Sequence, residues 1–265
     1  MILLDFDPPL ATVTLNRPER HNSLVPELLK QLLAALAEVA ARQDVRVLVL
    51  KANGRSFSTG GDLGGFVEHR DDLERYAGRL VGLLNETIVA LIDLPVPVVA
   101  AVHGIVTGGS LGLVLASDVA LVTRQASFTP FYSVVGFSSD GGWTALLPDV
   151  IGQKRAAELL LTNGTISAEQ AVAWGLASRL VPEEDLQREA RATALTIAAM
   201  QPGAVRAIKR RLWADVPVAQ RLEAERRSFV DQIVTAEAQA GMAAFLDGLR
   251  SNGSRAEGER ELVDR

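Results

Sequence analysis

The chain has 265 residues, of which 48% are hydrophobic and 22% charged, and its formal net charge is −5. This length is enough to bury one sizeable core. The acidic balance, and the lack of aromatics among the few basic clusters, argue against a nucleic-acid partner. With no cysteine and three scattered histidines, His21, His69 and His103, we expect neither disulfides nor thiolate chemistry nor a metal centre.

The N-terminal residues do not resemble a secretory signal. Asp5 and Asp7 interrupt a short apolar run that has no basic flank. The most apolar region, residues 88–122, is broken by Asp93, two prolines, a glycine cluster and Asp118. This leaves no stretch long enough to cross a membrane. We therefore expect a cytoplasmic protein with no membrane partner.

Strands and helices alternate along the first two thirds of the chain. The residue patterns predict strands over 12–15, 46–50, 97–102 and 118–122, and helices over 26–41, 71–92 and 109–116. Such an alternation favours the α/β class, with stacked or parallel strands whose faces are covered by the crossover helices.

From Glu183 onward the pattern becomes wholly helical, with predicted helices over 183–200, 203–213 and 218–249. In the last of these, an apolar stripe is formed by Val218, Leu222, Phe229 and Ile233. We assign a charged, solvated face to Arg221, Glu223, Glu225, Arg226 and Arg227. A lid or an oligomerisation arm is expected here rather than a second independent domain. The polar tail, residues 251–265, is expected to be disordered at its end.

Three glycine-rich segments are the places where chemistry is expected: residues 57–63, 104–112 and 136–143. None is a nucleotide phosphate loop, because no Gly-Lys-Ser/Thr follows and residues 108–112 lack the GxGxxG spacing. Glycines let the backbone approach a ligand closely, and Gly109 at a helix start would aim free N–H groups at an anion. For any one segment alone, an ordinary strand-to-helix turn is the competing interpretation.

Taken in order, six stretches closely resemble the crotonase, or enoyl-CoA hydratase/isomerase, superfamily from residue 12 to about residue 249. They are residues 13–24, 57–63, 98–118, 151–161, 167–176 and 241–246. The resemblance implies an α/β fold: a superhelix of ββα turns in residues 1–182 and a helical trimerisation region in residues 183–265. It also implies an acyl-CoA thioester substrate, a homotrimer or homohexamer, and no cofactor beyond the coenzyme A of the substrate itself.

The resemblance places two backbone donors at Gly61 and Gly109. In the family these N–H groups stabilise a thioester enolate or a related oxyanion. Two fixed donors stabilise the charge that builds on the thioester oxygen without having to reorganise. The resemblance also implies substrate contacts at Arg20, His21, Ser58, Gly60, Asp62, Leu63 and Tyr132.

Several of these contacts have a simpler alternative. Arg20 and His21 match positions near the coenzyme A phosphates, or they are ordinary surface charge. Tyr132 orients the substrate or only forms a wall of the acyl pocket, since an amphipathic aromatic suits both. Asp62 is better explained as a hydrogen-bond acceptor that holds the Gly61 turn than as a catalyst.

The sequence departs from the hydratases of the family at both of their catalytic glutamates. Those positions are Gly112 and Tyr132 here, so the pair of carboxylates that activates water is absent. A carboxylate stands instead at Asp140. Branches that lack both glutamates place their catalytic aspartate at this position, as a base in ring-modified acyl-CoA isomerases and as a nucleophile in chlorobenzoyl-CoA dehalogenases. The alternative for Asp140 is the N-cap of a short helix.

The sequence therefore favours a cofactor-independent enoyl-CoA isomerase in which Asp140 moves a proton from C2 to C4. One base suffices because the proton is only relocated, and this requires a raised pKa of Asp140. Three alternatives stay open: a hydratase whose water is positioned by another group, an Asp140-nucleophile dehalogenase or thioesterase, and a non-catalytic acyl-CoA-binding scaffold. The resemblance argues against dehalogenation, because the activating histidine of the dehalogenases aligns near Asn85 here.

Overall fold

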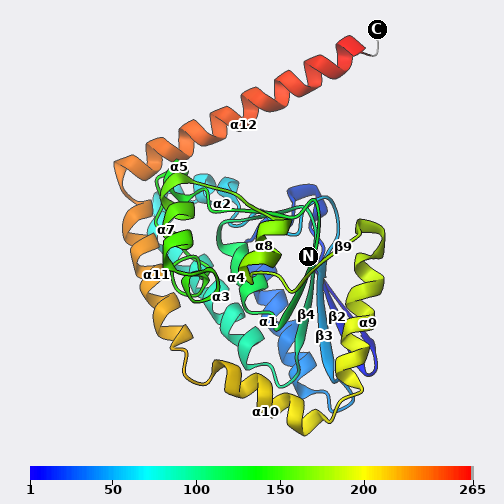
Figure 1. The fold of residues 1–265 in the computed structure, drawn as a ribbon. Coiled ribbons are helices and arrows are strands. Elements are labelled where there is room, and N and C mark those ends of the chain that lie inside the picture. The colour runs from blue at the N-terminus through cyan, green and yellow to red at the C-terminus, as the bar shows by residue number, and fades with distance from the viewer. Residues whose placement is uncertain (264–265) are drawn as a thin grey trace.

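The computed structural model describes the backbone of residues 1–263 and the side chains through residue 251. Its strands are β1 (Ile2–Asp7), β2 (Leu10–Leu15), β3 (Val47–Ala52), β4 (Val98–Val102), β5 (Ile105–Thr107), β6 (Val119–Thr123), β7 (Ser127–Thr129), β8 (Ile166–Ser167) and β9 (Arg179–Val181). They form a six-stranded sheet in the order β1-β2-β3-β4-β6-β9 and a three-stranded sheet in the order β5-β7-β8 (Figure 1).

The larger sheet is parallel except at one edge. β1 and β2 form an antiparallel pair, whereas the pairs from β2 to β9 are all parallel. A parallel sheet has to be covered on both faces. In β3, Leu48 and Leu50 belong to the main core, while Val47 and Val49 belong to a second apolar cluster on the opposite face. This alternation is the period-two pattern of a strand that is buried on both sides.

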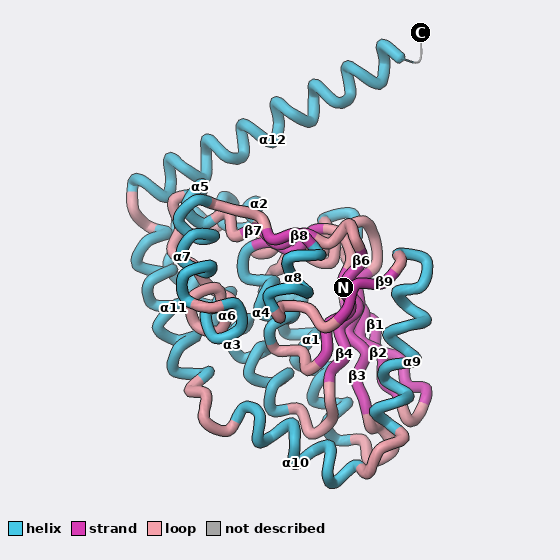
Figure 2. The backbone as a smooth tube through the Cα atoms, in the orientation of Figure 1, coloured by secondary structure: helices cyan, strands magenta, loops and turns pink. Residues whose placement is uncertain are grey.

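Helices cover the two faces (Figure 2). The α-helices are α1 (Pro26–Ala41), α2 (Leu63–Glu68), α3 (Leu73–Asp93), α4 (Leu111–Leu115), α5 (Tyr132–Val135), α6 (Leu147–Ile151), α7 (Gln153–Thr162), α8 (Ala168–Trp174), α9 (Leu186–Ala198), α10 (Pro202–Trp213), α11 (Val218–Ile233) and α12 (Ala236–Val263). Short 3₁₀ turns are η1 (Pro18–Arg20), η2 (Arg70–Asp72), η3 (Gly108–Ser110) and η4 (Glu183–Asp185). α1 and α3 lie on the main-core face, and α9 packs its alanine-rich side on the other face.

Most predicted elements are confirmed within a residue or two, and three differences stand out. The N-terminal strand β1 and the small sheet of β5, β7 and β8 were not expected. The predicted helix over 218–249 is wrong, because the chain turns between Ile233 and Ala236, where the Thr235 hydroxyl accepts the N–H of Ala238. α12 continues through most of the polar tail and extends away from the body in Figure 1. The tail that is expected to be disordered at its end spans residues 251–265, and its last two residues lie outside the described residues.

The division of the chain at residue 182 stays a prediction. In the structure two of the helices after residue 182 are packed on the rest of the molecule, α9 against β3 and β4 and α11 against α3. Within the residues described here, no helix combines the length and the apolar character needed to span a bilayer.

Candidate active site

A cavity of about 600 Å³ is bordered by all three glycine-rich segments and by the C-terminal helices α11 and α12. Its wall is mainly apolar, with aromatic and aliphatic side chains from Leu24, Leu63, Phe66, Leu80, Leu84, Phe131, Val135, Phe137, Phe229, Phe245 and Leu246. The buried residues Tyr132 and Asp140 also line it, as do the buried polar residues Ser23, Asp62 and Thr107. An apolar cavity with a few convergent polar groups is the usual form of a small-molecule site.

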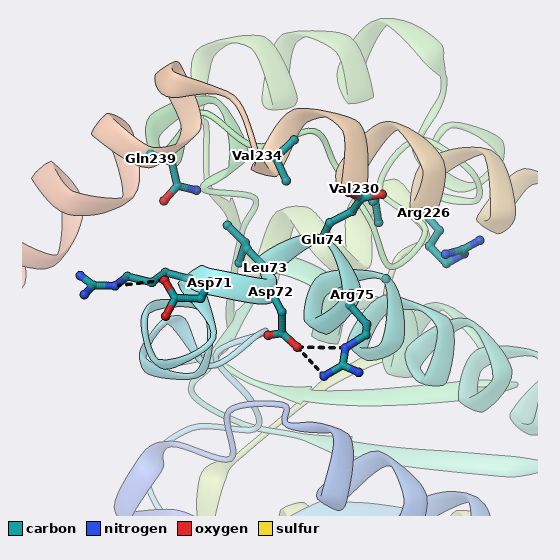
Figure 3. Close-up of a pocket in the computed structure, with 11 residues that line it drawn as sticks. Asp71, Asp72, Leu73, Glu74, Arg75, Arg226, Val230, Val234 and Gln239 are labelled. Atoms are coloured by element: carbon teal, nitrogen blue, oxygen red, sulfur yellow. Dashed lines mark hydrogen bonds and ion pairs between the residues drawn. The ribbon is translucent and has the colours of Figure 1, made fainter.

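A larger hollow of about 890 Å³ lies on the outside, between η2 and α11 (Figure 3). Its charged side chains pair with one another: Asp72 accepts from Arg75, and Asp71 lies 4.0 Å from Arg70. These side chains are exposed, so water and their partners satisfy them. No buried polar group is aimed into this hollow from the residues that line it, and we place the active site in the smaller cavity.

The first predicted donor, Gly61, lines the cavity at the end of a short extended stretch. Gly61 is bridged to Leu24, with the Leu24 N–H donating to Gly60 at 2.7 Å and the Asp62 N–H donating to Leu24 at 3.0 Å. The N–H of Gly61 belongs to the same trans peptide as the Gly60 carbonyl, and the two groups point in opposite directions, so this N–H points away from Leu24. The structure thus leaves this N–H available to a ligand.

The second predicted donor, Gly109, is the second residue of η3, where backbone N–H groups have no partner inside the helix. Two backbone hydrogen bonds join this loop to the Gly61 loop, from Ser58 to Ile105 and from Thr107 to Ser58. The indole N–H of Trp143 donates to the Gly108 carbonyl at 2.7 Å, which fixes the peptide that precedes Gly109. The two glycines therefore belong to adjacent, mutually braced loops.

Asp140 lies against Gly109. A Cβ built on Gly109 would stand 3.0 Å from Oδ1 and 3.2 Å from Oδ2 of Asp140. The hydroxyl of Tyr132 donates a short hydrogen bond to Oδ1 of Asp140. The N-cap interpretation of Asp140 is wrong, because the next helix after it, α6, begins at Leu147. Asp140 and the predicted donor Gly109 thus meet in one place.

The electrostatics of Asp140 suit a base at neutral pH. Burial raises the pKa of Asp140 to about 7, the hydrogen bond from Tyr132 opposes this rise, and the negative charge of Glu225 adds to it. The pKa of Tyr132 is raised well above its ordinary value by burial and by the neighbouring Asp140, so Tyr132 stays a hydrogen-bond donor. A carboxylate with a pKa near 7 can both accept and return a proton.

The two positions of the hydratase glutamates are closed to that chemistry. A Cβ on Gly112 would lie 2.3 Å from Cδ1 of Ile88 and 2.7 Å from the carbonyl oxygen of Gly141. A glutamate at position 112 would therefore overlap α3 and the loop that carries Asp140. At the second position, the Tyr132 side chain is directed to Asp140.

The predicted contacts at Arg20, His21, Asp62 and Leu63 all line the cavity. Both oxygens of Asp62 are engaged, by Arg17 and Arg20 and by the N–H of Gly64. Burial acts to raise the pKa of Asp62, but the hydrogen bonds and charges of the two arginines outweigh it and lower that pKa. Asp62 thus caps α2 and braces the Gly61 loop. Arg20 is half exposed at the rim.

Two predicted substrate contacts, Ser58 and Gly60, are not among the residues that line the cavity. Ser58 is buried, and its hydroxyl donates to the carbonyl of Asn22 at 2.8 Å. Gly60 packs against the adjacent loop, where a Cβ would lie 2.6 Å from the Thr107 carbonyl oxygen. Both residues support the cavity wall through contacts with the protein, and their contact with the substrate stays a prediction.

Sequence reasoning missed the part that the C-terminal helices take in the site. Phe229 and Phe245 line the cavity, and Glu225 is 5% exposed rather than on a solvated face. A signal for Glu225 exists in the sequence. Residues 218, 222, 225, 229 and 233 follow one another at helical spacing, so Glu225 falls on the apolar stripe and not opposite it.

Fold and site together define an α/β protein with a largely apolar pocket that contains two buried carboxylates, Asp62 paired with arginines and Asp140 without a cationic partner. Comparison with known proteins gives the family. The model of the enoyl-CoA hydratase/isomerase family matches residues 6–252, and the chain belongs to this family. The structure accordingly has the crotonase fold.

Individual relatives carry different names. The chain is 40% identical over 230 residues to "Probable enoyl-CoA hydratase EchA12" of Mycobacterium tuberculosis, covering 83% of this chain and 79% of that protein. It is 34% identical over 179 residues to "4-chlorobenzoyl coenzyme A dehalogenase-2" of an Arthrobacter species, covering 67% and 65%. The crystal structure of an enoyl-CoA hydratase/isomerase from Mycobacterium paratuberculosis superposes with a TM-score of 0.85 at 28% identity, covering 92% and 97%.

Proposed function

We propose that this protein is an enoyl-CoA isomerase that converts 3-enoyl-CoA to 2-enoyl-CoA with Asp140 as its base. The observation that carries the proposal is the placement of Asp140, a buried carboxylate with a pKa of about 7, against Gly109 in the cavity. The other carboxylates on the cavity wall are Glu19, which is exposed, and Asp62, which is bound to two arginines.

In the proposed reaction the thioester oxygen accepts hydrogen bonds from the N–H groups of Gly61 and Gly109. Asp140 removes a proton from C2, and the electron pair moves into the dienolate, whose negative charge the two donors stabilise. The protonated Asp140 then returns the proton to C4, so the double bond moves from C3–C4 to C2–C3. No water is consumed, and the carboxylate ends in its starting form.

Two observations favour this reaction over the alternatives in the family. Hydration needs a second group to hold water, and Gly112 has no space for a glutamate. Dehalogenation by a nucleophilic aspartate is less well supported. Asn85, near which the activating histidine of the dehalogenases aligns, is not part of the cavity wall. Its side-chain amide donates to the Leu222 carbonyl on α11 at 2.9 Å.

Substrate, assembly and location follow the same proposal. The apolar wall suits a hydrocarbon acyl group, and Arg20 and His21 at the rim suit the phosphates of coenzyme A. No other cofactor is proposed. We further propose a homotrimer or homohexamer in the cytoplasm, and light scattering would show the mass of three or six chains.

The test is a direct assay of the Asp140→Asn variant. The purified wild type converts 3-enoyl-CoA to the conjugated 2-enoyl-CoA, which is followed by ultraviolet absorbance. The variant keeps the size of the side chain and both backbone donors, so it binds acyl-CoA but does not isomerise it. A wild type that binds enoyl-CoA without turnover would support the scaffold alternative, and rapid hydration of crotonyl-CoA would support the hydratase.

A further inference from the structure

A second buried carboxylate lies behind Asp140. Glu225 on α11 accepts the N–H of Gly142 at 2.8 Å through Oε2. Its Oε1 accepts the N–H of Thr144 at 2.7 Å, the N–H of Ala145 at 2.9 Å and the hydroxyl of Thr144 at 2.6 Å. A buried carboxylate needs such donors in place of water. Glu225 is not among the residues that line the cavity, so it does not touch the substrate there.

The segment held by Glu225 is the one that carries Asp140. Residues 137–146 form neither helix nor strand, so no regular secondary structure fixes the position of Asp140. Gly141 has a φ of +63°, and a Cβ there would lie 2.3 Å from the carbonyl oxygen of Gly109. The segment is thus clamped between the Gly109 loop on one side and Glu225 on the other.

Glu225 also acts on Asp140 through its charge. Among the described residues, the titratable groups that influence Asp140 are Tyr132 from α5, which lowers its pKa, and Glu225 from α11, which raises it. The neighbouring side chain from α3 is the apolar Leu84, whose Cδ2 would lie 2.5 Å from a Cβ on Gly109. The pKa of Glu225 itself is raised by burial, and the hydrogen bonds of the 142–145 segment act against that rise.

We propose that Glu225 is the positioning residue of the base: its carboxylate anchors the 142–145 segment so that Asp140 stays against Gly109 and Tyr132. The role has a second, electrostatic part, because the negative charge of Glu225 opposes the ionisation of Asp140. This inference rests on the proposed role of Asp140. It makes the C-terminal helix α11 part of the catalytic apparatus and not only a surface for assembly.

The Glu225→Gln variant tests both parts. It removes the charge and places an amide N–H₂, itself a donor, next to the four donors of the 142–145 segment. The segment then loses its anchor, Asp140 is misplaced, and kcat falls about 10- to 100-fold. KM changes little, because the cavity wall is untouched. The midpoint of the pH dependence of kcat moves to lower pH. Glu223→Gln is the matched control: Glu223 lies on the same helix, is bound to Arg226 and Arg227 at the surface, and its replacement leaves kcat and the midpoint unchanged.

The Glu225→Asp variant tests the positioning role apart from the effect of charge. It also replaces the glutamine variant if that protein does not fold. It keeps the charge but is one methylene shorter, so kcat falls while the midpoint stays at the wild-type value. A wild-type kcat in Glu225→Asp, or an unshifted midpoint in Glu225→Gln, would overturn the inference. If Asp140→Asn still isomerises, the proposed function fails. If it is inactive and Glu225→Gln has the wild-type profile, only the role of Glu225 fails.

Discussion

Replacing Asp140 with asparagine should make the protein more stable at neutral pH, even though it removes the proposed base. The folded protein raises the pKa of this carboxyl from 3.8 to about 7. Each pKa unit is worth about 1.4 kcal/mol, so the rise corresponds to a cost of about 4 kcal/mol for holding the ionised form in the fold. Relaxation and water entry reduce such costs, and we expect about 2 to 4 kcal/mol.

The pH dependence has a definite sign. The folded pKa lies above the unfolded one, so the folded chain holds the proton longer and the wild type loses stability as pH rises from about 4 to about 7. The asparagine side chain has no charge and shows no such loss. The stability of Asp140→Asn relative to wild type is therefore near zero at pH 4 and grows to its full value by pH 8.

Urea unfolding of both proteins across this pH range measures the difference, and titrating groups that do not interact with Asp140 cancel in the comparison. Asp71→Asn is the control, because the side chain of Asp71 is fully exposed and its replacement should produce no comparable rise. A stability difference between Asp140→Asn and wild type that does not change with pH would show that Asp140 is not held at a raised pKa.

Three further substitutions test the geometry of the site. Gly109→Val places a Cβ 2.5 Å from Leu84 and 3.0 Å from Asp140, so kcat/KM should fall about 100-fold or more in steady-state assays. A folded variant with wild-type kcat/KM would refute the assignment of Gly109 as a donor. Gly112→Glu should not create a hydratase, because Ile88 and Gly141 occupy the space; hydration of crotonyl-CoA by a stably folded variant would contradict this. Tyr132→Phe removes the hydrogen bond that lowers the pKa of Asp140, so the midpoint of the pH–rate profile should move above about 7, and an unchanged midpoint would contradict the pairing.

Local patterns predicted much of the scaffold. Strands such as β3 and β4 are continuous β-branched and aliphatic runs, and α1 has leucines at helical spacing, so their own residues determine their structure. The small sheet was missed because strands of two or three residues carry no period of their own. Their pairing partners, as between β7 and β8, come from distant parts of the chain. β1 has six residues with alternating burial, and it was missed because Asp5 and Asp7, which lie on its exposed face, were considered only as a break in an apolar run.

The residues of the site that could be predicted are those that lie in the sequence motifs of the family. Gly61, Gly109 and Asp140 were found through the resemblance, and the structure brings Asp140 to Gly109. The roles of Tyr132 and Glu225 were not visible, because each depends on a tertiary contact with the segment around Asp140. Glu225 was assigned to a charged face on residue type alone, although its position on the apolar stripe of α11 indicated burial.

The most direct test of the one-base mechanism is conversion of 3-enoyl-CoA in deuterated water by wild type and Asp140→Asn, followed by mass spectrometry or NMR. The wild type should form 2-enoyl-CoA in which much of the proton removed from C2 is recovered at C4. Deuterium should appear at C4 of the product and at C2 of recovered substrate only to the extent that the protonated Asp140 exchanges with solvent. Asp140→Asn should bind the same thioester with similar affinity but neither convert nor exchange it. Isomerisation by Asp140→Asn at the wild-type rate, or rapid hydration of crotonyl-CoA by the wild type, would contradict the mechanism.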